Sequence, residues 1–435
     1  MSTVSNTISE DFTSTKNTYL PWIVCFSAAL FFFYEFIQMN MFNAISSDLM
    51  RDFGINATQL GNLSAIYFYA NLLFLPFAGM LLDRFSTRKL ILITISLCII
   101  GIGSFSLTHS LFLAGIFRFM SGIGSAFCFL SSIRLASRWF TPNRMALVSG
   151  LIVTMAMIGG MVAQTPLALL IEHFGWRTAL QFDVALGLII MGIIFMMVKD
   201  YPPNSQVTQQ TNQTDLQSMG LLRSWRLSYC NIQNWLGGIY TCTLNLPIAL
   251  LGAIWGSLYL VQVEHLSRIQ ASYVTTVLFV GALLGGPAVG WLSDRMKRRC
   301  LPMRLGAICS MALMLAIIYL PNLSLTTYLV LFFLLGFITS TQVISYPLVA
   351  ESNSRSLTAT SVSVVSFCAI SGYAIFQPLF GWLMDRDWHG VMVDNVRIYS
   401  SSDYQHALWI IPLGFIVALI ANYFMRETYA EIKNQ

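Results

Sequence analysis

The sequence is poor in charge. Only 10% of its 435 residues are Asp, Glu, Lys or Arg, whereas soluble proteins carry about 25%. It contains no Walker A phosphate loop, no HExxH zinc motif and no GxSxG nucleophile motif. Its eight cysteines are scattered without a CxxC pair or a Cys/His cluster, which argues against a disulfide framework or metal site. We therefore expect neither an enzyme nor a protein with a cofactor or metal.

Apolar residues take the place of charge. They make up 56% of the chain, and the mean hydropathy is +0.67. A membrane-spanning helix needs roughly 20 apolar residues, and twelve stretches of about that length are present. These lie near 20–42, 58–82, 89–108, 111–135, 145–170, 176–198, 228–262, 270–292, 301–320, 324–349, 357–384 and 406–425. The sequence thus predicts an all-α integral membrane protein with twelve transmembrane helices.

A repeat divides these helices into two sets. PFAGMLLDR at 76–84 returns as PAVGWLSDR at 287–295, which is 211 residues later. A repeat of this period indicates two copies of one large unit, so we expect two six-helix bundles. The predicted parts are a disordered cytoplasmic tail (1–18), the first bundle (19–198), a cytoplasmic linker (199–227), the second bundle (228–426) and a cytoplasmic tail (427–435).

The positive charges predict the orientation. If the N-terminus is cytoplasmic, eighteen of the 24 Lys and Arg residues fall on the cytoplasmic side and five on the other, while Arg118 lies inside a span. The positive-inside rule therefore places both termini in the cytoplasm. The basic clusters sit in short loops between spans, so we do not expect a nucleic-acid partner. The predicted partners are the bilayer, a small solute and protons, and we expect a monomer.

The charged repeat resembles the loop motif of the major facilitator superfamily, between the second and third helices of each half. The residues that carry this resemblance are Gly79, Asp83, Arg84, Arg88, Lys89, Gly290, Asp294, Arg295, Lys297 and Arg299. We expect these residues, apart from the two lysines, to form a gating motif. In physical terms, a glycine lets two helices approach, and a carboxylate beside arginines can form a breakable ion pair between bundles.

A second motif supports the resemblance. RFMSGIGSA at 118–126 is similar to the family's fourth-helix pattern at Arg118, Gly122, Gly124 and Ala126. The fifth-helix antiporter motif departs from the family pattern, since Ala163-Gln164 replaces its Gly-Pro pair. Within the family, the first two helices resemble phagosomal-type nutrient and amino-acid permeases of intracellular bacteria and, more distantly, lysosomal dipeptide uniporters. This resemblance implies the bacterial inner membrane as the location.

Three charged residues lie inside predicted spans: Glu35, Arg118 and Asp183. Each costs at least about 2.5 kcal/mol at a helix centre, so each is a functional candidate. The resemblance implies that the first and fourth helices line the central cavity, which favours Glu35 and Arg118 as a proton-coupling pair. A static ion pair that fixes helix packing is the alternative. Asp183 is a further coupling candidate or a partner to a neighbouring helix.

Further polar residues within the spans are candidates for binding the solute, although helix–helix hydrogen bonding is the alternative for each. With the charged pair, the predicted substrate-binding set is Tyr34, Glu35, Gln38, Arg118, Asn234, Tyr240, Gln342 and Gln377. The sequence predicts a secondary active transporter of a small polar organic solute, with an amino acid or short peptide favoured, working by alternating access with proton symport. The alternatives are an exporter of a drug or siderophore and a non-transporting membrane receptor or scaffold.

Overall fold

The computed structural model describes residues 19–140, 144–202, 221–320, 323–353, 358–393 and 396–429. The predicted tail at 1–18, most of the predicted linker and the end of the predicted C-terminal tail lie outside these residues. The first half contains α1 (Leu20–Asn40), α2 (Phe42–Phe53), α3 (Ala57–Arg84), α4 (Thr87–Leu107), α5 (Leu111–Trp139), α6 (Met145–Val162), α7 (Thr165–Phe174) and α8 (Trp176–Met197).

The second half is also almost entirely helical. It contains α10 (Leu221–Cys230), α11 (Ile232–Leu244), the π-helix η2 (Ile248–Trp255), α12 (Gly256–Gln262), α13 (Arg268–Met296), α14 (Cys300–Tyr319), α15 (Leu325–Thr339), the 3-10 helix η3 (Ser340–Ile344), α16 (Ser345–Glu351), α17 (Thr358–Arg386), α18 (Ser401–Leu408) and α19 (Ile410–Phe424). A two-stranded hairpin pairs β1 (Met392–Val393) with β2 (Val396–Arg397).

Eleven spans in the described residues are long and apolar enough to cross a membrane. A twelfth is formed by α11 together with η2 and α12, which meet at a bend of 42°. Helices dominate because a bilayer offers no partner for backbone N–H and C=O groups, so each span must bond its own backbone. The predicted all-α membrane fold with twelve transmembrane helices in two bundles is confirmed.

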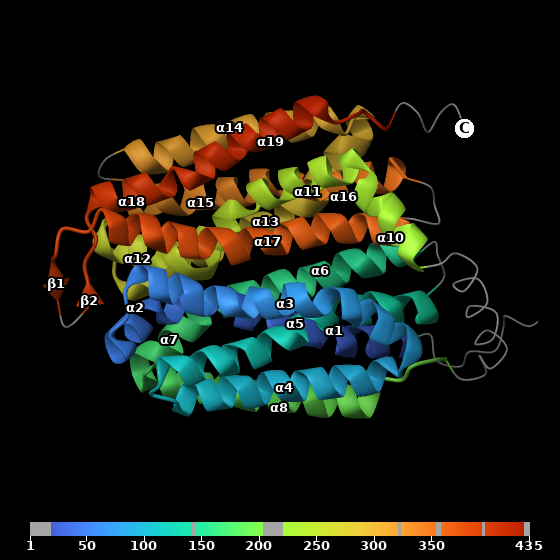
Figure 1. Cartoon of the computed structure of the whole chain (residues 1–435), viewed down its shortest axis with the longest axis horizontal. Coiled ribbons are helices and arrows are strands. Elements are labelled where there is room, and N and C mark those ends of the chain that lie inside the picture. Colours follow the sequence, from blue (N-terminus) through green and yellow to red (C-terminus); the bar gives the residue numbers. More distant parts are fainter. Residues whose placement is uncertain are drawn as a thin grey trace, which may run out of the picture.

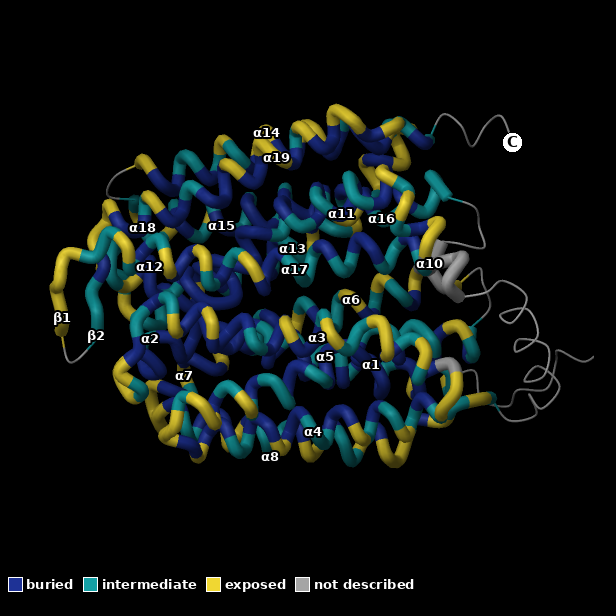
Figure 2. The backbone as a smooth tube through the Cα atoms, viewed as in Figure 1, coloured by how far each residue is buried: buried dark blue, intermediate teal, exposed yellow. Residues whose placement is uncertain are grey.

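The outward-facing side chains fit a bilayer. Figure 2 shows buried residues where the helices face one another and exposed residues along the outer faces of helices such as α4, α8 and α19. Most of the exposed residues on these faces are apolar, among them Ile93, Ile100, Ile189, Met196 and Ile420. A soluble monomer rarely exposes apolar patches of this extent, so these faces are the ones that contact lipid.

The two halves lie against each other along α3 and α17 and along α6 and α13 (Figure 1). One end of the molecule carries α2, α7, α12, α18 and the hairpin, and we term it the α2 end. The opposite end carries α10, and we term it the α10 end. At the α2 end, Gly61 and Gly381 let α3 and α17 approach closely: a Cβ on Gly381 would lie 2.3 Å from the Ala57 carbonyl oxygen.

Hydrogen bonds between the halves reinforce this contact. The Asp385 carboxylate, at the end of α17, accepts the Thr58 N–H at 2.7 Å and the Thr58 hydroxyl at 2.6 Å, at the start of α3. An anion at a helix N-terminus is favourable because the first N–H groups have no partner in their own helix. Tyr399 donates its hydroxyl to Asp385 at 2.6 Å. Burial and this hydrogen bond hold the pKa of Tyr399 well above its usual value.

Further polar contacts join the halves at the same end. Arg268 of α13 forms an ion pair with Asp48 of α2. Asn43 accepts the Ser257 N–H at 2.9 Å and donates to Gln164 at 2.6 Å. All the hydrogen bonds and ion pairs between the halves that join described residues lie in the part of the molecule toward the α2 end. The two halves are thus bonded together at the α2 end.

We predict that Gly381→Val opens the α2 end, because the added side chain cannot fit against the Ala57 carbonyl oxygen. The measurement is the distance between spin labels on Glu172 and Arg386, two exposed positions on different halves. This distance should lengthen in Gly381→Val. Gly286→Val is the matched control, because a Cβ at Gly286 meets nothing within 4 Å. Equal distances in the two variants would contradict the conclusion that this close contact holds the two halves together at the α2 end.

Candidate functional site

Arg118 is the centre of the candidate site. It lies on α5, and its side chain is fully buried. Its guanidinium carbon is 4.4 Å from the centroid of the Phe42 ring and 4.4 Å from that of the Tyr67 ring. Its Nη1 donates to the Gln38 carbonyl oxygen at 2.9 Å. Its Nε and Nη2 atoms have no hydrogen-bond partner in the structure, so two donors remain for a ligand or water.

Glu35 lies close to Arg118 and is 1% exposed. The Tyr67 hydroxyl donates to Glu35 Oε2 at 2.7 Å, and the ring of the same tyrosine contacts the guanidinium. Glu35 and Arg118 are therefore joined through Tyr67, without a direct ion pair between these two described side chains. The two predicted residues are neighbours, and in place of the alternative, a static ion pair, the structure shows a shared aromatic neighbour.

Asp183 belongs to the same cluster. It lies on α8 and accepts a hydrogen bond from Gln38 Nε2 at 2.6 Å. Because the Gln38 carbonyl oxygen accepts from Arg118, this glutamine connects the acid to the arginine. Tyr34 lies beside them, since its hydroxyl oxygen would be 2.6 Å from a Cβ on Gly187, one turn after Asp183. The structure thus brings together all five predicted residues of the first half.

The glycines of the 118–126 motif explain how the cluster fits between helices. A Cβ on Gly122 would lie 2.2 Å from the Tyr67 carbonyl oxygen, so the backbones of α5 and α3 touch there. A Cβ on Gly124 would lie 2.4 Å from Glu35 Oε1. Only glycine leaves room for the tyrosine backbone at one position and for the carboxylate at the other. The motif therefore positions Tyr67 and Glu35 next to Arg118.

The predicted residues of the second half are not gathered in one place. Asn234 donates to the Ser228 carbonyl oxygen at 2.8 Å, Tyr240 donates to that of Met303 at 2.7 Å, and Gln377 donates to that of Ala249 at 2.9 Å. All three are buried. In this conformation they therefore hold helices together, which was the alternative for each.

Gln342 has a different setting. It is partly exposed, and its Nε2 donates to Asn245 Oδ1 at 3.3 Å, at the bend between α11 and η2. Asn245 in turn donates to the Tyr373 hydroxyl at 3.3 Å. The Tyr373 ring stacks on Phe68 of the first half, with ring centroids 4.7 Å apart. This uncharged group therefore faces the charged cluster across the boundary between the halves.

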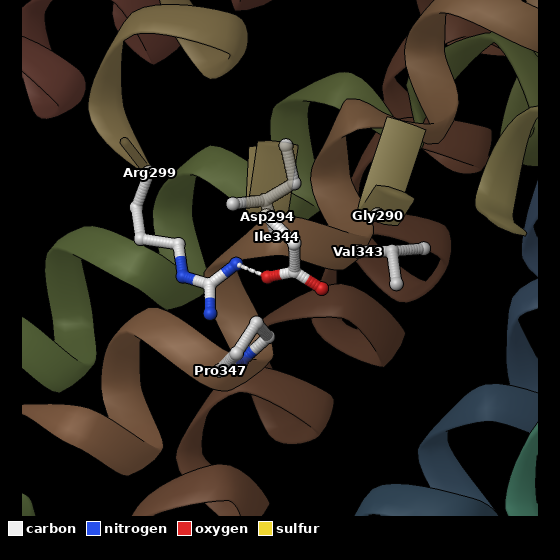
Figure 3. A pocket seen from close by; sticks show the side chains of 6 residues that line it. All are labelled: Gly290, Asp294, Arg299, Val343, Ile344 and Pro347. Carbon is white, nitrogen blue, oxygen red and sulfur yellow. Dashed lines mark hydrogen bonds and ion pairs between the residues drawn. The ribbon is translucent and has the colours of Figure 1, made fainter. Parts of the chain in front are cut away.

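The gating motif differs from the expected latch. In the second copy, Arg299 donates to Asp294 at 2.6 Å and to Glu351 at 2.8 Å, both in its own half. Burial lowers the pKa of Arg299, but these hydrogen bonds outweigh it and raise the pKa above its usual value. Figure 3 shows Asp294 and Arg299 facing each other in a cavity of about 130 Å³, which is also lined by Gly290, Val343, Ile344 and Pro347.

The first copy also bonds within its own half. The Arg88 guanidinium donates to the Phe195 carbonyl oxygen, and the backbone N–H of Arg88 donates to the Asp200 carboxylate at 2.9 Å. Arg84 is exposed, and the Asp83 side chain lies outside the described part of the structure. A Cβ on Gly79 or Gly290 would meet nothing within 4 Å. The structure therefore does not show the expected close helix approach at these two glycines.

Comparison with known proteins decides the family. The model of the Major Facilitator Superfamily matches residues 25–368. The chain belongs to this superfamily. It is similar to monocarboxylate transporter 12 of Rattus norvegicus, with 27% identity over 65% of this chain and 63% of the rat protein, which is less than two thirds of that protein's length. It is also similar to a probable hexose phosphate transport protein of Chlamydia trachomatis, with 22% identity over 87% of this chain and 89% of that protein.

Solved structures share the fold of this superfamily member. A bacterial homologue of the human lysosomal transporter Spinster, in an inward-facing and unoccupied conformation, matches with a TM-score of 0.77 and 15% identity over 95% of this chain and 98% of its own. A D-xylose–proton symporter matches with a TM-score of 0.72 and 13% identity over 94% of this chain and 99% of its own. At these identities the likeness shows the fold alone.

Sequence reasoning missed Tyr67, Phe42 and Phe68. Tyr67 and Phe68 lie in the run IYFYA at 66–70, where three successive aromatic residues give no sign in the sequence of which one faces the charged residues. Phe42 is the last residue of the predicted first span, and its side chain carries no polar atom. The one usable signal was the Gly122 position, because a glycine in a motif beside Arg118 indicates a close neighbour without identifying it.

We predict opposite effects for two Gly→Ala substitutions in the first half. Alanine favours a helix over glycine by about 1 kcal/mol, so Gly150→Ala, where a Cβ meets nothing within 4 Å, should keep or raise the apparent melting temperature. Gly124→Ala places a methyl group against Glu35 and should lower it, since overpacking costs about 1–3 kcal/mol. Thermal unfolding of both purified variants checks this. A Gly124→Ala protein as stable as Gly150→Ala would contradict the described packing.

Proposed function

We propose that this protein is a secondary active transporter that carries a small polar organic solute by alternating access, coupled to proton symport. The observation that carries the proposal is the buried cluster of Arg118 with Glu35 and Asp183, in which two guanidinium donors lack a partner. Buried charge inside a membrane protein is costly and is a mark of transport pathways or proton relays. Membership of a transporter superfamily and the absence of enzyme motifs from the sequence argue for transport rather than catalysis.

The chemistry of the cluster favours a solute with a carboxylate. A guanidinium with free donors binds carboxylates and phosphates through two parallel hydrogen bonds. The similar proteins from rat and Chlamydia trachomatis are named for monocarboxylate and hexose phosphate, and both solutes are anions. An amino acid or short peptide remains our first choice, because its ammonium group can donate a hydrogen bond to the carboxyl group of Glu35, whose carbonyl oxygen still accepts one when the acid is protonated. The uncharged group of Gln342, Asn245 and Tyr373 then contacts the remainder of the solute.

The coupling scheme follows from the contacts of Glu35. While it is charged, this acid competes with a solute carboxylate for Arg118. When it takes up a proton, the local negative charge falls and the arginine can bind the solute anion. Proton and solute are then carried together. Asp183, held by Gln38, is the second acid through which the proton can leave.

The orientation is part of the proposal. The excess of Lys and Arg at the α10 end supports a cytoplasmic position for this end. The resemblance of the first two helices to bacterial permeases supports the bacterial inner membrane as the location. The described bonds between the halves at the α2 end then correspond to a closed outer gate. The expected boundaries of the two bundles, 19–198 and 228–426, and the expected monomeric state belong to the same proposal.

The test is uptake of labelled amino acids and dipeptides into proteoliposomes under an imposed proton gradient. Glu35→Gln should abolish accumulation against the solute gradient but keep exchange of labelled for unlabelled solute, because binding remains while proton coupling is lost. Arg118→Ala should weaken solute binding by about 10–100-fold, the value of a hydrogen bond to a charged group. Glu172→Gln, at an exposed carboxylate on α7, is the matched control and should behave as the wild type.

Thermal-shift measurements with amino acids, peptides and monocarboxylates identify the solute, because a ligand that binds the folded protein raises its apparent stability. Gradient-driven uptake that survives both Glu35→Gln and Arg118→Ala would refute the coupling scheme. Accumulation of the solute inside inverted membrane vesicles would identify an exporter instead.

A further inference from the structure

Tyr67 contacts both Glu35 and Arg118 with its side chain. It is fully buried on α3. Its hydroxyl donates to Glu35 Oε2 at 2.7 Å and also lies 3.2 Å from the Glu35 carbonyl oxygen. Its ring covers Arg118, with 4.4 Å between the guanidinium carbon and the ring centroid. One side chain therefore contacts both the acid and the arginine of the charged cluster.

The next residue along α3 reaches the other half. The Phe68 ring meets the Tyr67 ring edge to face, with centroids 5.2 Å apart and planes at 80°. The same Phe68 ring stacks on Tyr373 of α17, at 4.7 Å and 28°. Since Tyr373 accepts a hydrogen bond from Asn245, a continuous series of contacts leads from Glu35 to the polar group of the second half.

We propose that Tyr67 is the positioning residue that couples the protonation of Glu35 to the contact between the two halves. This inference rests on the proposed function. When Glu35 is charged, the Tyr67 hydroxyl is held on its carboxylate by a charge-assisted hydrogen bond. When Glu35 accepts a proton, this bond weakens, and the hydroxyl, which keeps its own proton, can donate to the nearby Glu35 carbonyl oxygen. The ring then moves relative to Arg118 and Phe68, and the stack on Tyr373 moves with it.

The backbone around Tyr67 makes this movement specific. Gly122 leaves no space between α5 and the backbone of Tyr67, since a Cβ there would lie 2.8 Å from the Tyr67 Cα. The backbone is therefore held while the side chain responds to the charge of Glu35. Other titratable or charged groups surround Glu35 on the helices that pack against α1: Cys98 on α4, Arg118 and Cys128 on α5, and Asp183 on α8.

The test is the pH profile of solute uptake in the Tyr67→Phe protein. This variant keeps both ring contacts and removes only the hydroxyl. A donor to a carboxylate stabilises its charged form, so without it Glu35 stays protonated to higher pH. The profile should move to higher pH by about one to two units, which corresponds to one hydrogen bond to a charged group. Tyr240→Phe is the matched control, because that buried hydroxyl bonds only within the second half, and its profile should stay at the wild-type position.

A second variant tests the link to the other half and does not depend on the behaviour of Tyr67→Phe. Phe68→Leu removes the stack on Tyr373 while leaving the Tyr67 hydroxyl in place. Solute exchange should persist, but the number of protons moved per solute should fall. An unchanged pH profile in Tyr67→Phe, or unchanged proton coupling in Phe68→Leu, overturns the inference. If the inference on Tyr67 is overturned but Glu35→Gln still abolishes accumulation, the proposed function stands. If Glu35→Gln accumulates solute like the wild type, both the proposed function and this inference are refuted.

Discussion

The burial of one guanidinium between two aromatic rings is the constraint that organises the first half. Arg118 cannot be exposed to lipid, and it makes only one hydrogen bond within the described structure. The Phe42 and Tyr67 rings both contact it, and such contacts contribute about 2 kcal/mol or more when desolvated. Everything nearby follows from this placement: α1 supplies Glu35 and Gln38, α8 supplies Asp183, and two glycines of α5 bring the backbones close enough for these side chains to meet.

Much of the fold could be predicted from the sequence because the bilayer imposes a length and a polarity on every span. The repeat at 76–84 and 287–295 predicted two bundles, because a duplicated loop implies a duplicated set of helices on either side of it. The contacts of the loop motif could not be predicted, because they depend on which end is closed. Arg299 bonds to Glu351 in its own half, and no pattern in the sequence distinguishes this arrangement from a bond to the other half.

The candidate site divides in a similar way. Charged residues within apolar spans stand out, so Glu35, Arg118 and Asp183 were all identified, and the structure places them in one cluster. Tyr67 was missed because its role comes from its neighbours in space and not from its type. Conversely, Tyr240 and Gln377 were selected as polar residues within spans, yet they donate to backbone carbonyl groups. A polar side chain within a membrane span needs a hydrogen-bond partner. Only the fold shows whether that partner belongs to another helix or is left for a solute.

The proposed alternating access requires the contacts between the halves to break and to form again, and their position bears on how much free energy this takes. The Asp385 and Asp48 contacts lie at the end of the spans and are only partly buried, so water replaces them when they break, and each contributes about 1 kcal/mol. A change from 1:99 to 99:1 between two states needs about 5.5 kcal/mol, which is within reach of a few such contacts together with the binding of one solute. The charged cluster behaves differently, because an unpaired buried charge costs several kcal/mol. In the proposed cycle, each charged residue of the cluster must therefore gain a new partner as it gives up the old one. Tyr67, which contacts both Glu35 and Arg118, is placed to support such an exchange.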